Sequence, residues 1–139
     1  MTDPPDLVVY VDGASRGNPG PASTGIVFLR GGREFMAKGE LAGRLTNNQA
    51  EYLALVRGLR QARKCLLDPG RSTLEVRSDS RVLVGQMKKE YGTKNANLID
   101  LAAEAHRLVA GFAVVTFLHL PRWANARADA LCDEALDGS

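Results

Sequence analysis

The chain lacks any apolar run that approaches the ~20 residues needed for a transmembrane helix. Its first six residues hold no basic cluster and no apolar stretch of the kind that forms a secretion signal. These absences predict a cytoplasmic protein with no membrane partner. Cysteine is also scarce. Cys65 and Cys132 both fall in helical apolar patterns, so we expect reduced core residues rather than a disulfide or a metal site.

The chain also lacks a large excess of positive or negative charge. Eighteen basic residues against 16 acidic ones give a net charge of +2, which permits a polyanionic partner without requiring one. A content of 45% hydrophobic and 24% charged residues is typical of a globular protein. No repeat, low-complexity segment or linker divides the 139 residues. We expect a monomer with one domain over residues 7–136, a tail at 1–6 and another at 137–139.

Apolar periodicity, interrupted by Gly and Pro, predicts the element order βββαβααβα. Thr46 and Gln49 have the spacing of a capping box at a helix start. A helix between the first and fourth strands predicts a right-handed parallel crossover. The fold class is therefore α/β, with a five-stranded mixed sheet (three antiparallel strands, then parallel additions) flanked by helices. The expected strands are 7–12, 24–30, 35–41, 73–78 and 112–120, and the expected helices are 46–67, 80–89, 98–110 and 125–136.

Carboxylates occur where apolar elements end or begin. Asp12 and Asp79 each close an apolar strand, and parallel neighbours would bring both to the edge where α/β sheets place ligands. Glu51 heads a helix face of small and apolar residues, and Asp129 borders the apolar stripe of the last helix. A carboxylate in such a place is costly unless it is paired or binds a cation.

Each of these acids also has an ordinary explanation. Glu51 and Asp129 could complement a helix dipole, and Asp12 could form a turn. Together, however, four carboxylates would repel one another, and a divalent cation offsets that repulsion. Oxygen ligands without a cluster of His or Cys favour Mg²⁺ or Mn²⁺ over zinc.

Four segments resemble the signature motifs of type 1 ribonuclease H, in that family's order and roughly its spacing. They are DGASRGNPG (12–20), TNNQAE (46–51), SDS (78–80) and NARAD (125–129). The resemblance covers about residues 7–136.

This resemblance implies a ribonuclease H-like fold and a metal-dependent endoribonuclease. Asp12, Glu51, Asp79 and Asp129 would be the catalytic residues and would bind two Mg²⁺ ions, with Mn²⁺ as a substitute. The reaction would be hydrolysis of the RNA strand of RNA–DNA hybrids, leaving 5′-phosphate and 3′-hydroxyl ends.

The resemblance also implies substrate contacts. Asn18, Asn47 and Asn48 match positions that touch RNA 2′-hydroxyls, which is how a protein distinguishes RNA from DNA. Arg44 and Thr46 match a pocket for a phosphate of the DNA strand. The Asn47, Asn48 and Thr46 side chains could equally serve as ordinary polar groups at a helix start.

The chain departs from the family pattern in two places. The loop 121–124 has no histidine where many members carry a mobile one, and His119 falls inside a strand, as a core or sheet-face residue. We expect Arg122 to take the histidine's place in product release or as a phosphate contact. Residues 91–98 resemble the short form without a basic protrusion, which leaves open whether double-stranded RNA is cut.

Two other functions remain open on sequence grounds. One is a non-catalytic module that binds hybrid, and the other is a DNA-cutting nuclease of the same broad fold. The four carboxylates argue against the first, and Asn18 with the segment 46–51 argues against the second. A Rossmann-like nucleotide site is excluded because the glycines do not form G-x-G-x-x-G.

Overall fold

In the computed structural model, five strands form one mixed sheet in the order β3-β2-β1-β4-β5. The structure describes residues 3–89 and 95–138. The first three strands are antiparallel, and β4 and β5 add in parallel, as predicted. The strands are β1 (Leu7–Ser15), β2 (Gly20–Arg30), β3 (Arg33–Leu45), β4 (Thr73–Ser78) and β5 (Val114–His119).

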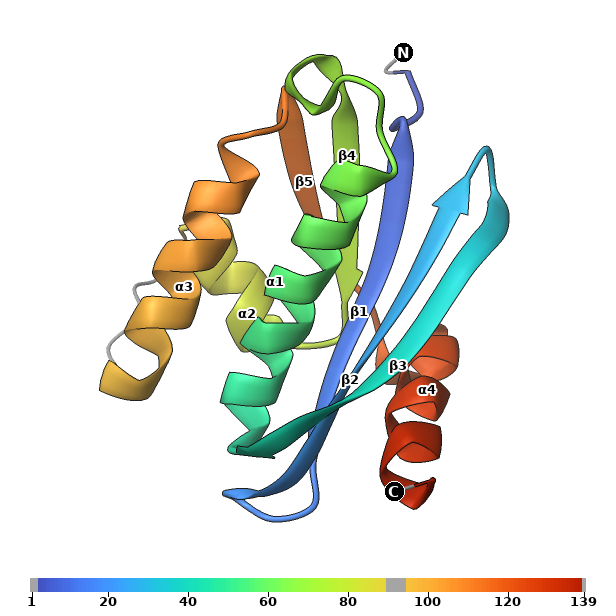
Figure 1. Cartoon of the computed structure of the whole chain (residues 1–139). Helices are drawn as coiled ribbons and strands as arrows, with labels where there is room; N and C mark the ends of the chain where they lie inside the picture. Colours follow the sequence, from blue (N-terminus) through green and yellow to red (C-terminus); the bar gives the residue numbers. More distant parts are fainter. Residues whose placement is uncertain (1–2, 90–94, 139) are drawn as a thin grey trace.

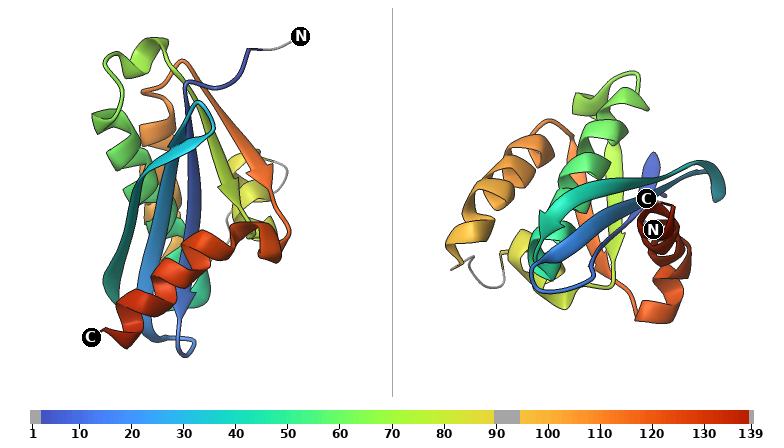
Figure 2. Two further views of the ribbon diagram at one scale, coloured as in Figure 1. Left: turned by 90° about the vertical axis from the view of Figure 1, so that its right-hand side faces the viewer. Right: turned by 60° about the horizontal axis from the view of Figure 1, so that its bottom comes forward.

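Helices cover the two faces of the sheet unequally. Three of the described helices lie on one face, and the fourth, α4 (Ala126–Asp137), lies on the other, against β1, β2 and β3 (Figures 1 and 2). Two short 3₁₀ turns, η1 (Pro69–Arg71) and η2 (Arg122–Asn125), complete the chain. The helices are α1 (Asn47–Lys64), α2 (Arg81–Met87), α3 (Ala96–Val109) and α4 (Ala126–Asp137).

Helix α1 packs against the central strand β1. Its predicted capping box is present: Thr46 Oγ1 accepts from Gln49 N at 3.1 Å, and Gln49 Oε1 accepts from Thr46 N at 2.9 Å. Gly58 is buried, and a Cβ there would lie 3.0 Å from Val11 Cγ1. This small residue lets the helix lie close to the sheet, and the capped end of α1 points toward the β1–β2 loop (Figure 1).

The larger core lies between the sheet and α1, α2 and α3, where Val9, Val11 and Leu55 are fully buried. Under α4 the core is thin, with Val27, Ala128 and Leu131 as its buried members. Hydrophobic burial therefore holds β1 mainly from the α1 side.

The first hairpin is longer than the sequence predicted. β1 continues through Asp12 to Ser15, and β2 begins at Gly20 rather than Thr24. The reason is antiparallel pairing, which runs on to Ser15 opposite Ala22. The parallel pairing of β1 with β4 ends earlier, at Tyr10. Asp12 thus lies inside a strand, just beyond the point where β1 and β4 separate.

Several other boundaries also differ. β3 runs to Leu45, because its pairing with β2 reaches Gly20 opposite Leu45. α1 ends at Lys64 with Cys65 as its C-cap, before the expected end at 67. Residues 122–125 form the turn η2 rather than an open loop. The predicted loop at 90–95 lies, apart from residue 95, outside the described residues.

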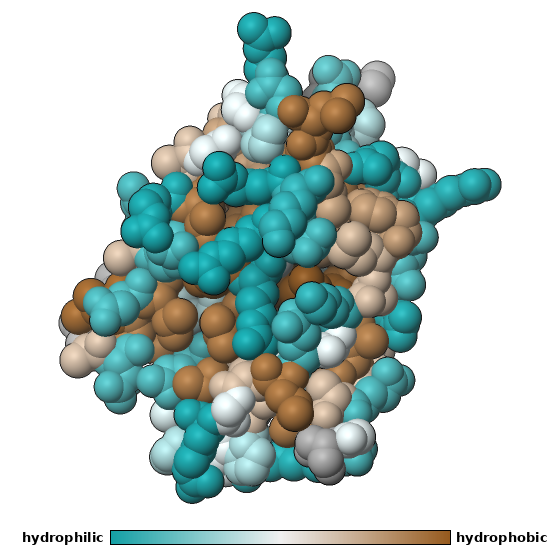
Figure 3. Space-filling model, viewed as in Figure 1, coloured by the Kyte–Doolittle hydropathy of each residue, from teal (hydrophilic) through white to brown (hydrophobic). Residues whose placement is uncertain are grey.

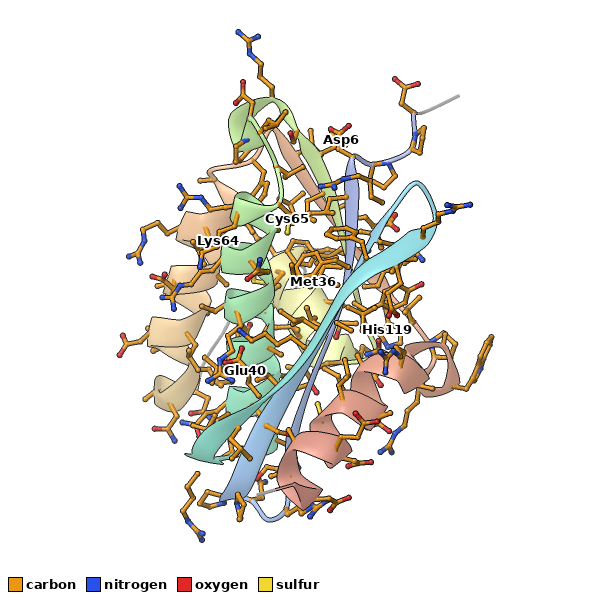
Figure 4. All side chains as sticks on the ribbon, turned by 45° about the vertical axis from the view of Figure 1, so that its right-hand side comes forward. Asp6, Met36, Glu40, Lys64, Cys65 and His119 are labelled. Carbon is orange, nitrogen blue, oxygen red and sulfur yellow. The ribbon has the colours of Figure 1, made fainter. Side chains whose placement is uncertain are left out.

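Both cysteines are free, with Cys132 buried and Cys65 half-buried at the end of α1 (Figure 4). Among the described helices, none has the length and apolar character required to cross a bilayer. The face seen in Figure 3 is mixed, with hydrophilic side chains running between separate apolar areas.

Candidate active site

The first part of the site forms where β1 meets the start of α1. A Cβ on Gly13 would lie 2.2 Å from the Ala50 carbonyl carbon, so only glycine permits this approach. The Gly13 amide donates to Glu51 Oε1 at 3.1 Å. Glu51 is therefore fixed beside Asp12, as the inward face of the predicted helix suggested.

The end of β4 supplies the next carboxylate. Ser80 caps α2 by accepting from Leu83 N at 3.2 Å, and its own amide donates to Ser78 Oγ at 3.0 Å. These two serines define the turn that holds Asp79 between β4 and α2. The parallel arrangement of β1 and β4 places Asp79 near Asp12, as predicted.

Helix α4 brings in the fourth acid. Asn125, only 1% exposed, donates from Nδ2 to the carbonyl of Val11 at 3.0 Å. The Cys132 thiol lies 3.3 Å from the carbonyl oxygen of Asp12. These contacts fasten α4 to β1 and set Asp129 at the rim. The sequence pattern does not predict this role for Asn125; its position just before the last helix is the only signal for it.

Carboxylate oxygens of Asp12, Glu51 and Asp79 lie within 4.8 Å of one another. Asp129 does not belong to this group of three but lines the same pocket. The rest of the pocket lining is charged, polar or small, apart from the apolar Leu136, and consists of Gly13, Ala14, Ser15, Arg16, Asn47, Arg122, Asp133 and Leu136.

The electrostatics of the cluster oppose full ionisation. Burial, followed by the charge of Glu51, raises the pKa of Asp12 to about 10. Burial also raises the pKa of Glu51 to about 7, against the lowering effect of its hydrogen bonds with Asp12 and Gly13. Burial raises the pKa of Asp79, and Arg122 opposes that shift. The protein alone thus does not compensate these negative charges near neutral pH.

A divalent cation fits this set of donors. Glu51 Oε2 is buried and has no hydrogen-bond partner among the described residues, so a strong acceptor is left unused. Three converging carboxylates and no imidazole or thiolate among the three suit a hard cation that takes oxygen ligands. The residues present therefore fit the divalent metal that the sequence predicted.

Two basic side chains lie near Asp79. Arg122 lines the pocket from η2, and its charge acts on Asp79. His119, labelled in Figure 4, is exposed at the end of β5, with Nε2 3.3 Å from the Asp79 carbonyl oxygen. His119 therefore lies in a strand, as predicted. Of the two environments predicted for it, core and sheet face, the core is wrong because the side chain is exposed.

Two of the predicted substrate contacts join the loop to α1. Asn18 Oδ1 accepts from the Asn47 amide at 3.1 Å, and Asn47 Oδ1 accepts from the Ser15 amide at 3.2 Å. Both asparagines are exposed beside the pocket or on its rim.

The other predicted contacts flank the start of α1. Asn48 and Arg44 are exposed, whereas Thr46 is half-buried and serves as the N-cap. The N-cap reading of Thr46 is therefore confirmed, and contact of these residues with nucleic acid stays a prediction.

Comparison with known proteins gives consistent matches. A family model described as Reverse transcriptase-like matches residues 10–135. Ribonuclease HI of Halobacterium salinarum is 43% identical over 129 residues, which are 92% of this chain and 63% of that protein. A bifunctional protein of Mycobacterium tuberculosis is 36% identical over 135 residues, 96% of this chain and 36% of that protein. The chain thus spans only part of these curated relatives.

Solved structures agree with the fold over nearly the whole chain. The crystal structure of RNase H1 from Halobacterium salinarum matches with a TM-score of 0.90 at 41% identity, covering 96% of this chain and 98% of that one. LC11-RNase H1, solved in complex with an RNA/DNA hybrid, matches with a TM-score of 0.87 at 36% identity, and the match covers 95% of this chain and 97% of that one.

Proposed function

Because this chain belongs to the type 1 ribonuclease H family, we propose that it hydrolyses the RNA strand of RNA–DNA hybrids. The products would carry 5′-phosphate and 3′-hydroxyl ends. The observation that carries the proposal is the convergence of Asp12, Glu51 and Asp79 within 4.8 Å, with one Glu51 oxygen unpaired.

The carboxylates have distinct tasks in this reaction. Asp12, at the centre of the cluster, would hold both of two Mg²⁺ ions, and Glu51, Asp79 and Asp129 would complete their ligands. When bound, such ions (Mn²⁺ can substitute) supply an activated water and charge stabilisation at the leaving 3′ oxygen. Asp12 is buried, and Glu51 accepts from the Gly13 amide, so their oxygens are held in place and little reorganisation accompanies the chemistry.

Selection of RNA would come from the rim of the pocket. In Asn18 and Asn47 the side-chain Oδ1 atom accepts a backbone hydrogen bond. The Nδ2 group of each side chain can therefore donate to a substrate. We assign these amides, together with Asn48, to the ribose 2′-hydroxyls of the RNA strand. Arg44 and Thr46 would contact a phosphate of the DNA strand.

Arg122 is assigned to the scissile phosphate or the departing product. Its guanidinium lines the pocket next to Asp79, where a cation attracts a phosphate without displacing the carboxylates. We further propose a cytoplasmic monomer with one catalytic domain over residues 7–136. Double-stranded RNA is the secondary substrate to test, because its A-form shape overlaps that of the hybrid.

The assay offers labelled hybrid, double-stranded RNA, single-stranded RNA and DNA with Mg²⁺, Mn²⁺ or chelator. We expect metal-dependent cleavage of hybrid, and loss of at least ~10³-fold in kcat for Asp12→Asn with the fold intact. Binding without cleavage would support the non-catalytic module instead, and preferential cleavage of DNA would support the other nuclease class. Retained activity of Asp12→Asn at saturating Mg²⁺ would overturn the assignment.

A further inference from the structure

Arg16 lies in the loop between β1 and β2 and is not one of the residues assigned to catalysis or to the RNA 2′-hydroxyls. Its Nη2 atom is 2.6 Å from Oδ1 of Asp137, at the last turn of α4. The side chains are 49% and 67% exposed. Figure 2 shows the end of α4 beside the β1–β2 loop, so the pair joins two segments far apart in the sequence.

The position of Arg16 relative to the carboxylates is the second observation. Arg16 lines the same pocket as Asp12 and Asp129, and Arg122 is the other arginine in that lining. The backbone of Arg16 is fixed, because its amide donates to the Pro21 carbonyl at 2.8 Å. Only the side chain needs to move for the guanidinium to reach a different acceptor.

We propose that Arg16 binds a phosphate of the RNA strand next to the cleavage site, and that Asp137 holds the guanidinium when no substrate is bound. This inference rests on the proposed function. An exposed ion pair contributes little, since water screens it. A guanidinium on a phosphate makes two parallel charge-assisted hydrogen bonds, so the exchange from Asp137 to phosphate is favourable.

A cation at Arg16 would also reduce the repulsion between the pocket and a negatively charged substrate. The pocket collects the carboxylates of Asp12, Glu51, Asp79, Asp129 and Asp133, which together repel a polyanion. Cations entering from two separate elements, the β1–β2 loop and η2, would offset this repulsion along the strand. Asp137 competes for one of those cations, and so it should weaken binding of the substrate.

If the ion pair between Arg16 and Asp137 were purely structural, removing either partner would change the affinity for hybrid in the same direction. If Arg16 binds phosphate and Asp137 competes, the two substitutions act in opposite directions. Arg16→Ala should weaken the affinity for hybrid ~10-fold at low salt and reduce the slope of log K against log salt by about 1. Asp137→Asn should tighten binding ~2- to 5-fold, because the competitor is gone.

The matched control is the ion pair between Arg127 and Glu34. It also joins α4 to the sheet, its side chains are 52% and 42% exposed, and neither residue lines the pocket. Arg127→Ala and Glu34→Gln should change the affinity for hybrid less than 2-fold. Binding is measured in the full chain carrying Asp12→Asn, so that the hybrid stays intact, and KM and kcat are measured with Asp12 present.

We expect Arg16→Ala to raise KM with kcat nearly unchanged. Equal effects of Arg16→Ala and Asp137→Asn in the same direction, or effects no larger than those of the control pair, would overturn the inference. The proposed function fails separately, if the unsubstituted chain does not cleave hybrid. In that case opposite shifts in binding would still support a phosphate contact at Arg16.

Discussion

The two parts of β1 differ in which groups form hydrogen bonds with their backbone amides and carbonyls. From Val8 to Tyr10 the strand pairs with β2 on one side and β4 on the other, and Leu7 pairs with β4. From Val11 to Ser15 it pairs with β2 alone, and side chains take the place of β4. The carbonyl of Val11 accepts from Asn125, the amide of Gly13 donates to Glu51, and the amide of Ser15 donates to Asn47.

This difference separates stability from function within one strand. Leu7 and Val9 are fully buried and contribute apolar contact. Asp12 is also nearly buried, at 5% exposure, but sits among like charges. The first part of β1 therefore holds in place a second part in which Asp12 lies among other carboxylates that repel it. Substitutions in the two parts should have different consequences.

The largest effect is expected where β1 and α1 touch. Gly13→Val places atoms where a Cβ already lies 2.2 Å from Ala50, so the helix must move. The free energy of unfolding should fall by more than ~3 kcal/mol, measured by urea denaturation. Gly70→Ala is the control, because its nearest neighbour atom is 3.7 Å from the added Cβ, and it should stay within ~0.5 kcal/mol. Equal effects would argue against a tight contact at Gly13.

The next effect belongs to the buried part of the strand. Val9→Ala removes two methyl groups from the core and should lower the free energy of unfolding by roughly 1–3 kcal/mol. Because Val9 does not line the pocket, kcat well below the melting temperature should change less than 2-fold. A large loss of kcat with the fold intact would show that the first part of β1 contributes to catalysis as well as to stability.

A smaller effect is expected at the α4 contact. Asn125→Ala leaves the Val11 carbonyl without its donor and should lower the free energy of unfolding by about 1–2 kcal/mol. It should also raise the Mg²⁺ concentration needed for half-maximal cleavage, because α4 carries Asp129. Ser23→Ala is matched, since its hydroxyl donates to the Cys132 carbonyl at 2.8 Å in a buried site. That variant should lose stability with a smaller change in Mg²⁺ dependence, and equal shifts would count against a positioning role for Asn125.

The stability of the protein in chelator should depend on pH, and this dependence can be compared with that in Mg²⁺. The folded-state pKa of Glu51, about 7, lies above its ordinary 4.5, and that of Asp12 lies above 3.8. A raised folded pKa means that the folded state holds protons more tightly. The stability that these two groups contribute is therefore fully present below pH ~4 and is lost as pH rises through 7. Thermal melts between pH 5 and 8 should show a decline that Mg²⁺ reverses. A flat profile for the unsubstituted chain would contradict these shifts, and Glu51→Gln should make the decline shallower.

Much of this organisation follows from sequence pattern. The capping box at Thr46, the small residue Gly58 on the helix face and the closeness of Asp12 to Asp79 were predicted and are confirmed. The prediction that Asp12 ends its strand was wrong, because β1 continues to Ser15. The confirmed features depend on local periodicity and short-range hydrogen bonds, which the sequence displays directly.

Other features depend on contacts between distant segments. The extension of β1 to Ser15 comes from pairing with β2, which competes with the turn tendency of residues 13–20. The bond from Asn125 to Val11 spans 114 positions, and the pair of Arg16 with Asp137 spans 121. Residue type does not specify such pairings, so they emerge only when the elements are packed together.

We infer that the carboxylates around Asp12 destabilise the metal-free protein and that a divalent cation compensates their repulsion. The most direct measurement is the free energy of unfolding of the unsubstituted chain and of Asp12→Asn, at pH 8, in chelator and in Mg²⁺. We predict that Asp12→Asn is the more stable protein in chelator, by roughly 1–3 kcal/mol, and gains little from Mg²⁺, whereas the unsubstituted chain gains clearly. A less stable Asp12→Asn in chelator, or an equal gain from Mg²⁺ in both proteins, would contradict the account.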